Sequence, residues 1–254
     1  MKPAMLFLDI ETAPDVVWTW GLWQANAIAV KEHWYVLSFA AKWRGDDTLM
    51  VNGLDDYKGY KGGKSTELKL LNDVWTLLDE ADIVVAHNGR DFDVKKLNAR
   101  FIEYGFAPPS PYKVVDTKSD LAGVAKYSSN KLDWLMKQFK IGAKMPHEGF
   151  DLWQGCMDGD KKAWKTMKAY NAHDVVLLEA LYNKISSWIP QPNAGLYEDR
   201  PTCPNPGCDG GTLIKRGLAR AITRVYQRYQ CDTCGTWSRS VKSEKGLGAQ
   251  IVRT

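Results

Sequence analysis

A short hydrophobic stretch near the start of the chain, Leu6 to Thr12, constrains the fold more than any other feature of the sequence. It reads Leu-Phe-Leu-Asp-Ile-Glu-Thr, which is typical of a β-strand that enters a core. Asp9 and Glu11 are two residues apart, so their side chains point to the same face of a strand. A carboxylate in a core is costly unless it is neutralised, paired or bound to a cation. Two interpretations stay open from this stretch alone: a divalent cation site, and an edge strand with an acidic, solvated face.

Length and composition set wider limits. A chain of 254 residues with 44% hydrophobic residues suffices for one sizeable core and a small second domain. We find no apolar run of membrane-spanning length, and Met1-Lys2-Pro3 leads directly into the first strand, so we expect no signal peptide. Five cysteines, four of them crowded into the tail, suit a reducing cytoplasm better than a secreted disulfide framework.

The charge is unevenly distributed along the chain. Residues 200–254 hold ten of the 34 Lys and Arg residues but three of the 30 Asp and Glu residues, which gives the tail a charge of +7 and the rest −3. A basic tail favours a polyanionic partner, and a solvated charged face is the alternative.

The order of the expected elements predicts the fold class. After the first strand, residues 13–31 fit neither period, so we expect an irregular insertion whose tryptophans pack in the core, with base stacking as the alternative. Further strands are expected at 34–43, 48–51, 82–87 and 113–116, and helices at 68–78, 93–104, 131–140, from 160 onward and at 170–188, with a looser stretch at 142–159. Three closely linked strands followed by alternating helices and strands indicate an α/β domain with a mixed sheet.

Three further side chains sit where a site would be built. Asp93 opens a helix just past a strand, a place where open sheets present site residues and where the helix dipole favours a carboxylate. Tyr170 and Asp174 are four residues apart in a helix, so they share one face. Each is weak evidence alone. Asp116, Asp120 and Asp151 are interpreted as turn or surface residues.

Together the acids resemble a known family. An acid pair on the first strand, Asn-x-x-x-Phe-Asp after a later strand and Tyr-x-x-x-Asp on a late helix resemble the three motifs of the DEDD exonuclease superfamily, in its tyrosine (DEDDy) variant. The resemblance covers most of residues 5–188. It points to proteins similar to the proofreading domains of DNA polymerases, in a stand-alone, often phage-encoded form, and it implies a ribonuclease H-like fold.

Two alternative assignments of these motifs exist. The histidine branch places its His five residues before the last Asp, where this chain has Ala169. His173 is adjacent to Asp174 and projects about 100° away on a helix. Asp91 is an alternative to Asp93, but the position after Phe92 matches the motif better.

The resemblance implies a two-metal chemistry. Asp9, Glu11, Asp93 and Asp174 would be the four carboxylates, and oxygen ligands of this kind suit Mg²⁺ or Mn²⁺. Two such ions clamp the attacking and leaving oxygens of a phosphodiester, and Tyr170 would orient the attacking water. The product would be nucleoside monophosphates released from a 3′ end. Asn88 either contacts the terminal nucleotide or braces its loop.

The tail predicts a second metal site. Cys203 and Cys208 form one close pair and Cys231 and Cys234 another, with 22 residues between the pairs. This spacing resembles a zinc ribbon, in which one tetrahedral Zn²⁺ supplies folding energy to a short segment, whereas redox-active pairs are the alternative. Cys156 is spare and is expected to be buried.

The basic residues of the tail alternate with aromatic ones, which is the composition of a surface for single strands. The expected nucleic-acid contacts are Arg216, Arg220, Arg224, Arg228, Tyr226, Tyr229 and Trp237. A protein-docking ribbon is the alternative.

The sequence therefore predicts a metal-dependent 3′–5′ exonuclease domain over residues 1–192 and a zinc ribbon over residues 200–254 that binds single-stranded nucleic acid, DNA more than RNA. We expect a monomer. The alternatives are a catalytically idle nuclease fold that serves as a binding adaptor, and an endonuclease or exoribonuclease that uses the same carboxylates.

Overall fold

The structure, a computed structural model, describes residues 2–21, 23, 26–146, 148–198, 201–246 and 248. The chain divides into two compact units, Ala4–Leu181 and a second one made of Met1–Pro3 with Tyr182–Thr254. Among the described residues, no helix has both the length and the apolar character that a bilayer crossing requires.

The larger unit is built on a five-stranded mixed sheet in the order β5-β4-β1-β6-β7. The hydrophobic stretch that opens the sequence is its central strand, and β4 pairs antiparallel with it while β6 pairs parallel. The strands are β1 (Met5–Thr12), β4 (Val36–Trp43), β5 (Leu49–Gly53), β6 (Ile83–Ala86) and β7 (Lys113–Asp116). The predicted α/β fold with a mixed sheet is therefore confirmed.

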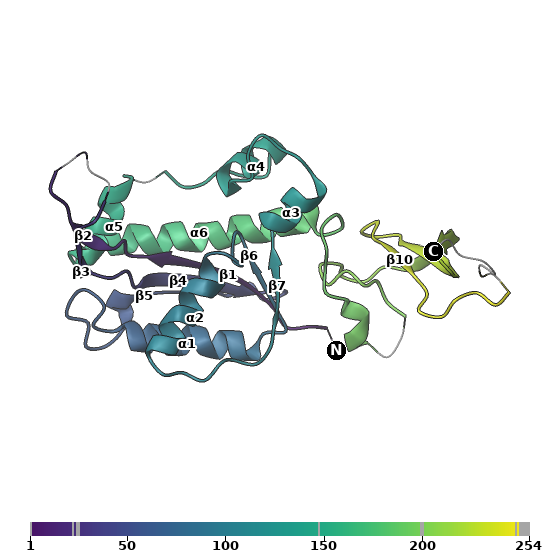
Figure 1. Ribbon diagram of the computed structural model, residues 1–254, viewed down its shortest axis with the longest axis horizontal. Coiled ribbons are helices and arrows are strands. Elements are labelled where there is room, and N and C mark those ends of the chain that lie inside the picture. Colours follow the sequence, from purple (N-terminus) through teal and green to yellow (C-terminus); the bar gives the residue numbers. More distant parts are fainter. Residues whose placement is uncertain are drawn as a thin grey trace. The chain divides into compact units, whose positions relative to one another are not determined.

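Helices cover both faces of this sheet. α1 (Glu67–Glu80) and α2 (Asp93–Glu103) lie along one face, and α6 (Lys161–Ile185) runs along the other (Figure 1). The shorter helices are α3 (Ser119–Val124), α4 (Leu132–Phe139) and α5 (Phe150–Met157), with 3-10 turns at Leu54–Asp56 and Ala194–Tyr197. The looser stretch expected at 142–159 thus contains a helix, α5, and the two helical patterns after residue 160 form one helix.

Alternation along β1 decides which side chains face which layer. Leu6, Leu8 and Ile10 are buried in one core cluster with Leu71 and Val74 of α1. Because successive side chains of a strand point to opposite faces, Asp9 and Glu11 face the layer of α6. The half-buried carboxylate pair therefore lies on the side of the sheet that α6, the helix with Tyr170 and Asp174, covers.

The tryptophan-rich segment differs from its prediction. β2 (Val16–Trp18) and β3 (Ala29–Glu32) pair antiparallel as a separate two-stranded sheet. These strands and the described residues between them are called the β2–β3 hairpin. The prediction of an irregular insertion was therefore wrong. Its indoles do not pack in the core: Trp18, Trp20 and Trp23 are 60%, 86% and 97% exposed.

The prediction that Asp116 is a turn or surface residue was also wrong. It is fully buried, and its carboxylate accepts hydrogen bonds from the backbone N–H groups of Asn88, Arg90 and Lys118. It braces the loop after β6 instead of lying on the surface.

A buried ion pair ties α1 to α2. The Arg100 Nε atom donates to Glu67 Oε1 at 2.8 Å and its Nη2 atom donates to Glu67 Oε2, while the Val36 N–H donates to the same carboxylate at 2.9 Å. Both side chains are almost fully buried. Glu67 therefore links two helices to β4 through one carboxylate.

We expect Arg100→Met to lower the free energy of unfolding by about 3–5 kcal/mol, because it leaves the Glu67 carboxylate buried without its cation. Urea unfolding followed by circular dichroism measures the loss. Glu103→Gln is the matched control, since Glu103 also pairs with Arg100 but is 61% exposed, and its loss should stay below about 1 kcal/mol. Equal losses in the two variants would contradict this account.

The smaller unit contains a three-stranded antiparallel sheet in the order β10-β9-β8. Its strands are β8 (Leu213–Arg220), β9 (Val225–Cys231) and β10 (Trp237–Arg239). The spacer between the two cysteine pairs thus forms strands, as expected for a ribbon.

Candidate active site and metal centres

The central strand carries its acids beyond the end of its parallel neighbour. β1 pairs with β4 as far as Thr12, but with β6 only from Met5 to Phe7. After Phe7, β1 no longer pairs with β6, and the backbone N–H of Ile10 donates instead to Asp93 Oδ1 at 3.1 Å. This hydrogen bond fixes Asp93 beside the two acids of β1.

A tight turn brings Asp93 to that position. β6 ends at Ala86, and Asn88 adopts a left-handed conformation with φ of 78°, which Asn tolerates better than most residues. A Cβ at Gly89 would lie 2.4 Å from the Cβ of Ala86, so this position requires glycine. α2 then begins at Asp93 itself.

α6 supplies the rest of the acidic cluster. Oxygen atoms of Asp9, Glu11 and Asp174 all lie within 4.8 Å of one another. Asp93 is not within that distance set, although its charge acts on Asp9. Tyr170 lies one turn before Asp174 on the same helix. The structure therefore brings three of the predicted ligands together and places Asp93 and Tyr170 beside them.

The acidic cluster is a set of crowded carboxylates, of which Asp93 and Asp174 are buried and Asp9 and Glu11 are half-buried. Burial, and then the negative charges of Asp93, Glu11 and Asp174, raise the pKa of Asp9 well above its ordinary value. Burial and the charge of Asp174 raise the pKa of Glu11 to about 7. Burial also raises the pKa of Asp93 to about 7, against the hydrogen bond from Ile10. The folded chain thus holds negative charges that repel one another, a situation that a bound cation relieves.

This repulsion predicts a pH dependence for the metal-free protein. The pKa of Glu11 is raised from 4.5 to about 7, so the folded state keeps a proton that the unfolded chain releases. Glu11 therefore contributes most to the free energy of unfolding below pH 4.5, and this contribution decreases as the pH rises through about 7. In EDTA, urea unfolding should show stability falling over this range more steeply in the wild type than in Glu11→Gln. Parallel curves for the two proteins would contradict the prediction.

Lys144 is a site residue that the sequence analysis missed. Its ammonium donates to the Tyr170 hydroxyl at 2.7 Å and to Asp174 Oδ2. Its pKa is raised by the pairing with Asp174, which outweighs the opposing effect of burial. Lys144 lies between α4 and α5 in a segment without periodicity, so no pattern in the sequence pointed to it.

Asn171 and Trp153 hold the two acids of β1 in place. The Asn171 Nδ2 atom donates to Asp9 Oδ2 at 2.6 Å, and its Oδ1 atom accepts from the Ser38 hydroxyl at 3.1 Å. Asn171 and Ser38 are fully buried. Trp153 Nε1 donates to Glu11 Oε2 at 3.2 Å, and its ring packs edge-on against Tyr170. The sequence analysis missed Asn171. The signal that could have found it is its place in the sequence, as a polar residue directly after Tyr170.

We expect Asn171→Leu to weaken divalent-metal binding about 10- to 100-fold, the usual effect of removing a hydrogen bond that orients a metal ligand. Calorimetric titration with Mn²⁺ measures the affinity. Asn171→Asp is the second variant, because it keeps the size but places another negative charge beside Asp9. Wild-type affinity in Asn171→Leu, with the fold intact, would contradict the assignment.

The acidic cluster fits a divalent cation. Asp174 is 2% exposed, and among the described residues its Oδ1 atom has no hydrogen-bond partner. A buried carboxylate oxygen without a partner is costly, and a cation would satisfy it. The donors are carboxylate oxygens, which Mg²⁺ and Mn²⁺ prefer.

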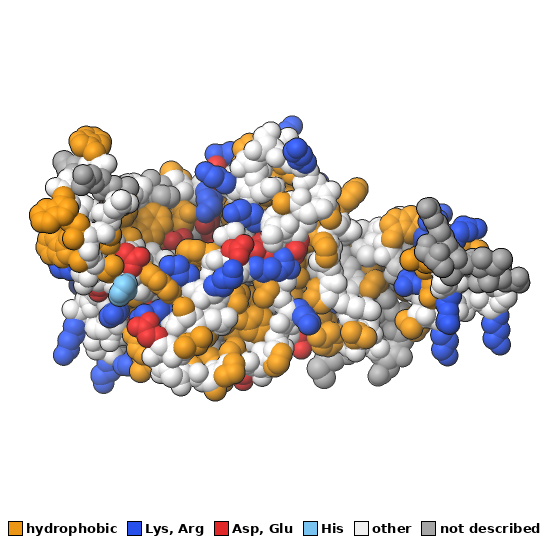
Figure 2. All heavy atoms as spheres, viewed as in Figure 1, with side chains coloured by type: hydrophobic (Ala, Val, Ile, Leu, Met, Phe, Trp, Pro, Cys, Tyr) orange, Lys and Arg blue, Asp and Glu red, His pale blue; other side chains and the backbone are white. Residues whose placement is uncertain are grey.

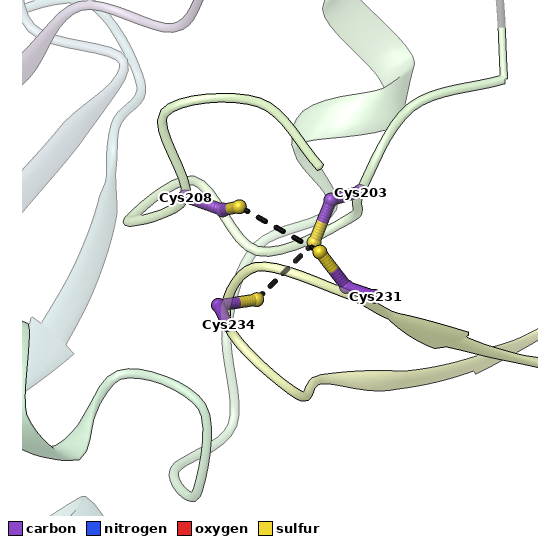
Figure 3. Close-up of side chains that lie close together, drawn as sticks. All are labelled: Cys203, Cys208, Cys231 and Cys234. Carbon is purple, nitrogen blue, oxygen red and sulfur yellow. Dashed lines mark hydrogen bonds between the residues drawn. The ribbon is translucent and has the colours of Figure 1, made fainter. Parts of the chain in front are cut away.

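The four tail cysteines form a second cluster (Figure 3). The sulfur atoms of Cys203 and Cys234 are 3.5 Å apart and those of Cys208 and Cys231 are 3.8 Å apart. These separations exclude disulfides, and they match the ~3.8 Å between sulfurs that a tetrahedral Zn²⁺ with Zn–S bonds of about 2.3 Å requires. A Cβ at Gly211 would lie 2.2 Å from the Cys231 sulfur, so the backbone closes tightly around the thiols. The residues present fit a zinc ion.

The predicted nucleic-acid contacts lie on both faces of the ribbon sheet. The guanidinium of Arg228 lies 4.8 Å from the ring centroid of Trp237, and that of Arg239 lies 4.0 Å from the ring of Tyr226. Tyr229 is adjacent to Arg228 on β9 and so points to the opposite face. In the larger unit, Asn88 Oδ1 accepts a hydrogen bond from Lys118 at 3.0 Å, which braces its loop.

Fold and site together define the class of protein: an α/β domain in which carboxylates of the central strand and of the last long helix lie close together. Comparison with known proteins gives the family. The sequence profile of the RNase_H superfamily matches residues 6–186, so this chain belongs to that superfamily and its fold is ribonuclease H-like.

Solved structures are also similar in fold. One of them is the family B DNA polymerase from the hyperthermophilic archaeon Pyrobaculum calidifontis, with a TM-score of 0.53 and 14% sequence identity. The match covers 87% of this chain but 33% of the polymerase, so the chain spans about a third of that protein. No curated protein sequence matches the chain.

Proposed function

We propose that this chain is a metal-dependent 3′–5′ exonuclease of the DEDDy type that hydrolyses single-stranded nucleic acid, DNA in preference to RNA. The observation that carries the proposal is the convergence of Asp9, Glu11 and Asp174 within 4.8 Å, with Asp93 bonded to the same strand. Membership of the RNase_H superfamily and a fold similar to that of a DNA polymerase support it.

The chain's own groups have distinct roles in this proposal. Asp9, Glu11 and Asp174 would hold one Mg²⁺ or Mn²⁺, and Asp9 with Asp93 a second. When bound, such ions stabilise charge on the phosphate and generate a nucleophilic hydroxide at neutral pH. Burial raises the pKa of Tyr170 to about 12, so its hydroxyl stays neutral and orients the attacking water without acting as a base. The Lys144 ammonium, next to this hydroxyl, offsets part of the negative charge of the acids.

The reaction adds water across the last phosphodiester. The water oxygen bonds to phosphorus, the bond to the O3′ atom of the preceding nucleotide breaks, and that oxygen leaves with a proton. The products are a nucleoside 5′-monophosphate and a strand shortened by one nucleotide.

The tail would assist by holding the strand. We propose a nuclease domain over residues 1–192 and a zinc ribbon over residues 200–254, with one structural Zn²⁺ on its four cysteines. Arg216, Arg220, Arg224, Arg228, Tyr226, Tyr229 and Trp237 would contact phosphates and bases. Four reduced thiolates suit a cytoplasm, including that of a phage-infected bacterium.

The decisive experiment uses 5′-labelled single strands with Mg²⁺ or Mn²⁺. We expect a ladder that shortens from the 3′ end, no cleavage of a circular strand, and slower digestion of matched RNA. Opening of the circle would establish an endonuclease instead. Tight binding without cleavage at any metal concentration would establish the idle binding adaptor.

A further inference from the structure

The β2–β3 hairpin exposes more large apolar side chains than a soluble chain ordinarily tolerates in one place. Trp18, Trp20 and Trp23 are 60–97% exposed, and Val17, Ile28 and Val30 are 39–49% exposed. Figure 2 shows hydrophobic side chains gathered at the place where Figure 1 draws β2 and β3. Contiguous exposed apolar surface of this kind marks a binding site.

The hairpin is attached directly to the acidic cluster. β1 ends at Thr12, one residue after Glu11, and β2 begins at Val16. A cavity of about 290 Å³ occupies the junction, and it is lined in part by Thr12, Trp34, Phe150 and Trp153. Trp153 is also the residue that donates to Glu11. The cavity is therefore lined by the segment that joins β1 to β2 and by a residue that contacts Glu11.

Cations accompany the rings on this surface. The Lys96 ammonium, which also lines the cavity, lies 3.6 Å from the ring centroid of Trp34, and the Lys31 ammonium lies 5.8 Å from the ring of Trp18. Asp15 lines the cavity too, but its Oδ1 atom accepts the Trp34 N–H at 3.1 Å and lies 3.4 Å from His33 Nδ1. Exposed indoles together with nearby ammonium groups match unpaired bases linked by phosphates.

We propose that the β2–β3 hairpin and this cavity form a stacking site for the unpaired bases of the strand whose 3′ end enters the acidic cluster. This inference rests on the proposed function and adds its substrate requirement: several unpaired nucleotides upstream of the scissile bond. A protein partner would also bind apolar surface. It would not account for the cavity beside the strand of Asp9 and Glu11 or for the lysines placed against the rings.

The test measures how cleavage depends on strand length. Oligothymidylates of two to twelve nucleotides are digested by the wild type, by the double variant Trp18→Ala with Trp20→Ala, and by Trp188→Ala. Trp188 is the matched control, a tryptophan that is 77% exposed outside the hairpin. In the wild type and the control we expect KM to fall with length. In the double variant we expect KM on the longest strands to rise about 10- to 100-fold, with kcat little changed, as the loss of one or two stacked bases would give.

A second substrate separates stacking from structural damage. Removing the bases, but not the phosphates, from the upstream nucleotides should raise the wild-type KM by the same factor and should leave the double variant unaffected. The proposal would be overturned if KM of the double variant depended on strand length as in the wild type. It would also be overturned if base removal raised KM of the double variant further, or if KM of the double variant rose equally on the dinucleotide.

Binding without catalysis keeps this inference distinct from the proposed function. Fluorescence anisotropy of a labelled twelve-nucleotide strand is measured without divalent metal, for the wild type and the double variant. A 10- to 100-fold weaker affinity in the double variant supports the stacking site even if the wild type cleaves nothing. Equal affinities overturn it even if the wild type is an active exonuclease.

Discussion

Replacing Asp9 by Asn is expected to reduce digestion of single-stranded DNA by at least about a thousandfold while leaving the fold intact. Asp9 is linked to the other members of the acidic cluster: it shares a face with Glu11, the Ile10 N–H of its strand donates a hydrogen bond to Asp93, and its side chain accepts a hydrogen bond from Asn171. Metal-assisted hydrolysis depends on several kcal/mol of charge stabilisation, which corresponds to this factor. Initial rates with Mg²⁺ and Mn²⁺, beside a thermal melt, measure both quantities.

The sharpest control compares Asp93 with Asp91. Asp93→Asn should lose activity to a similar degree, because Asp93 is 2% exposed and bonded to Ile10. Asp91→Asn should keep wild-type activity, since its side chain is 69% exposed and pairs with Lys95 in the first turn of α2. Retained activity in Asp9→Asn, or equal losses at positions 91 and 93, would refute the site.

Removing zinc is expected to unfold the ribbon while the larger unit stays folded. The hydrophobic cluster around the tail cysteines is small: Cys203, Cys208 and Cys231 are buried, with Leu213 and Cys234 partly buried against them. So small a core cannot hold three strands, whereas a structural zinc contributes an apparent ~10–16 kcal/mol at neutral pH. Metal analysis should find one zinc per chain, and chelation should abolish amide-hydrogen protection in β8–β10.

Cys203→Ser should lose zinc and that protection together. Cys156→Ala is the matched control, because Cys156 is fully buried in the core of the larger unit and should leave the zinc content at one. Protected ribbon amides in zinc-free Cys203→Ser would contradict the prediction.

The elements with strong periodicity were predictable. β4 and β6 are largely buried apolar runs, and α2 carries apolar residues at helical spacing, so these elements could be predicted. Motif spacing singled out Asp9, Glu11, Asp93, Tyr170 and Asp174 as site residues. Each of them stands on a regular element, and the structure places them near one another.

Other parts of the site were not predictable, for identifiable physical reasons. Lys144 lies in a segment without periodicity, and it meets Asp174 through tertiary packing that no local pattern encodes. The hairpin at Val16–Trp18 and Ala29–Glu32 exposes its apolar residues, so the rule that tryptophan packs in cores failed there. Asp116 appeared to be a surface residue because its buried partners are backbone N–H groups, which any sequence supplies.

The crowding of like charges around Asp9 has an evolutionary consequence. Carboxylates that raise one another's pKa destabilise the metal-free protein. Replacing one of them by a neutral side chain should therefore raise the free energy of unfolding while it removes the activity. In a lineage without selection for the activity, these residues should be among the first to be substituted. Intact acids in divergent descendants of this chain would therefore indicate continuing selection for function.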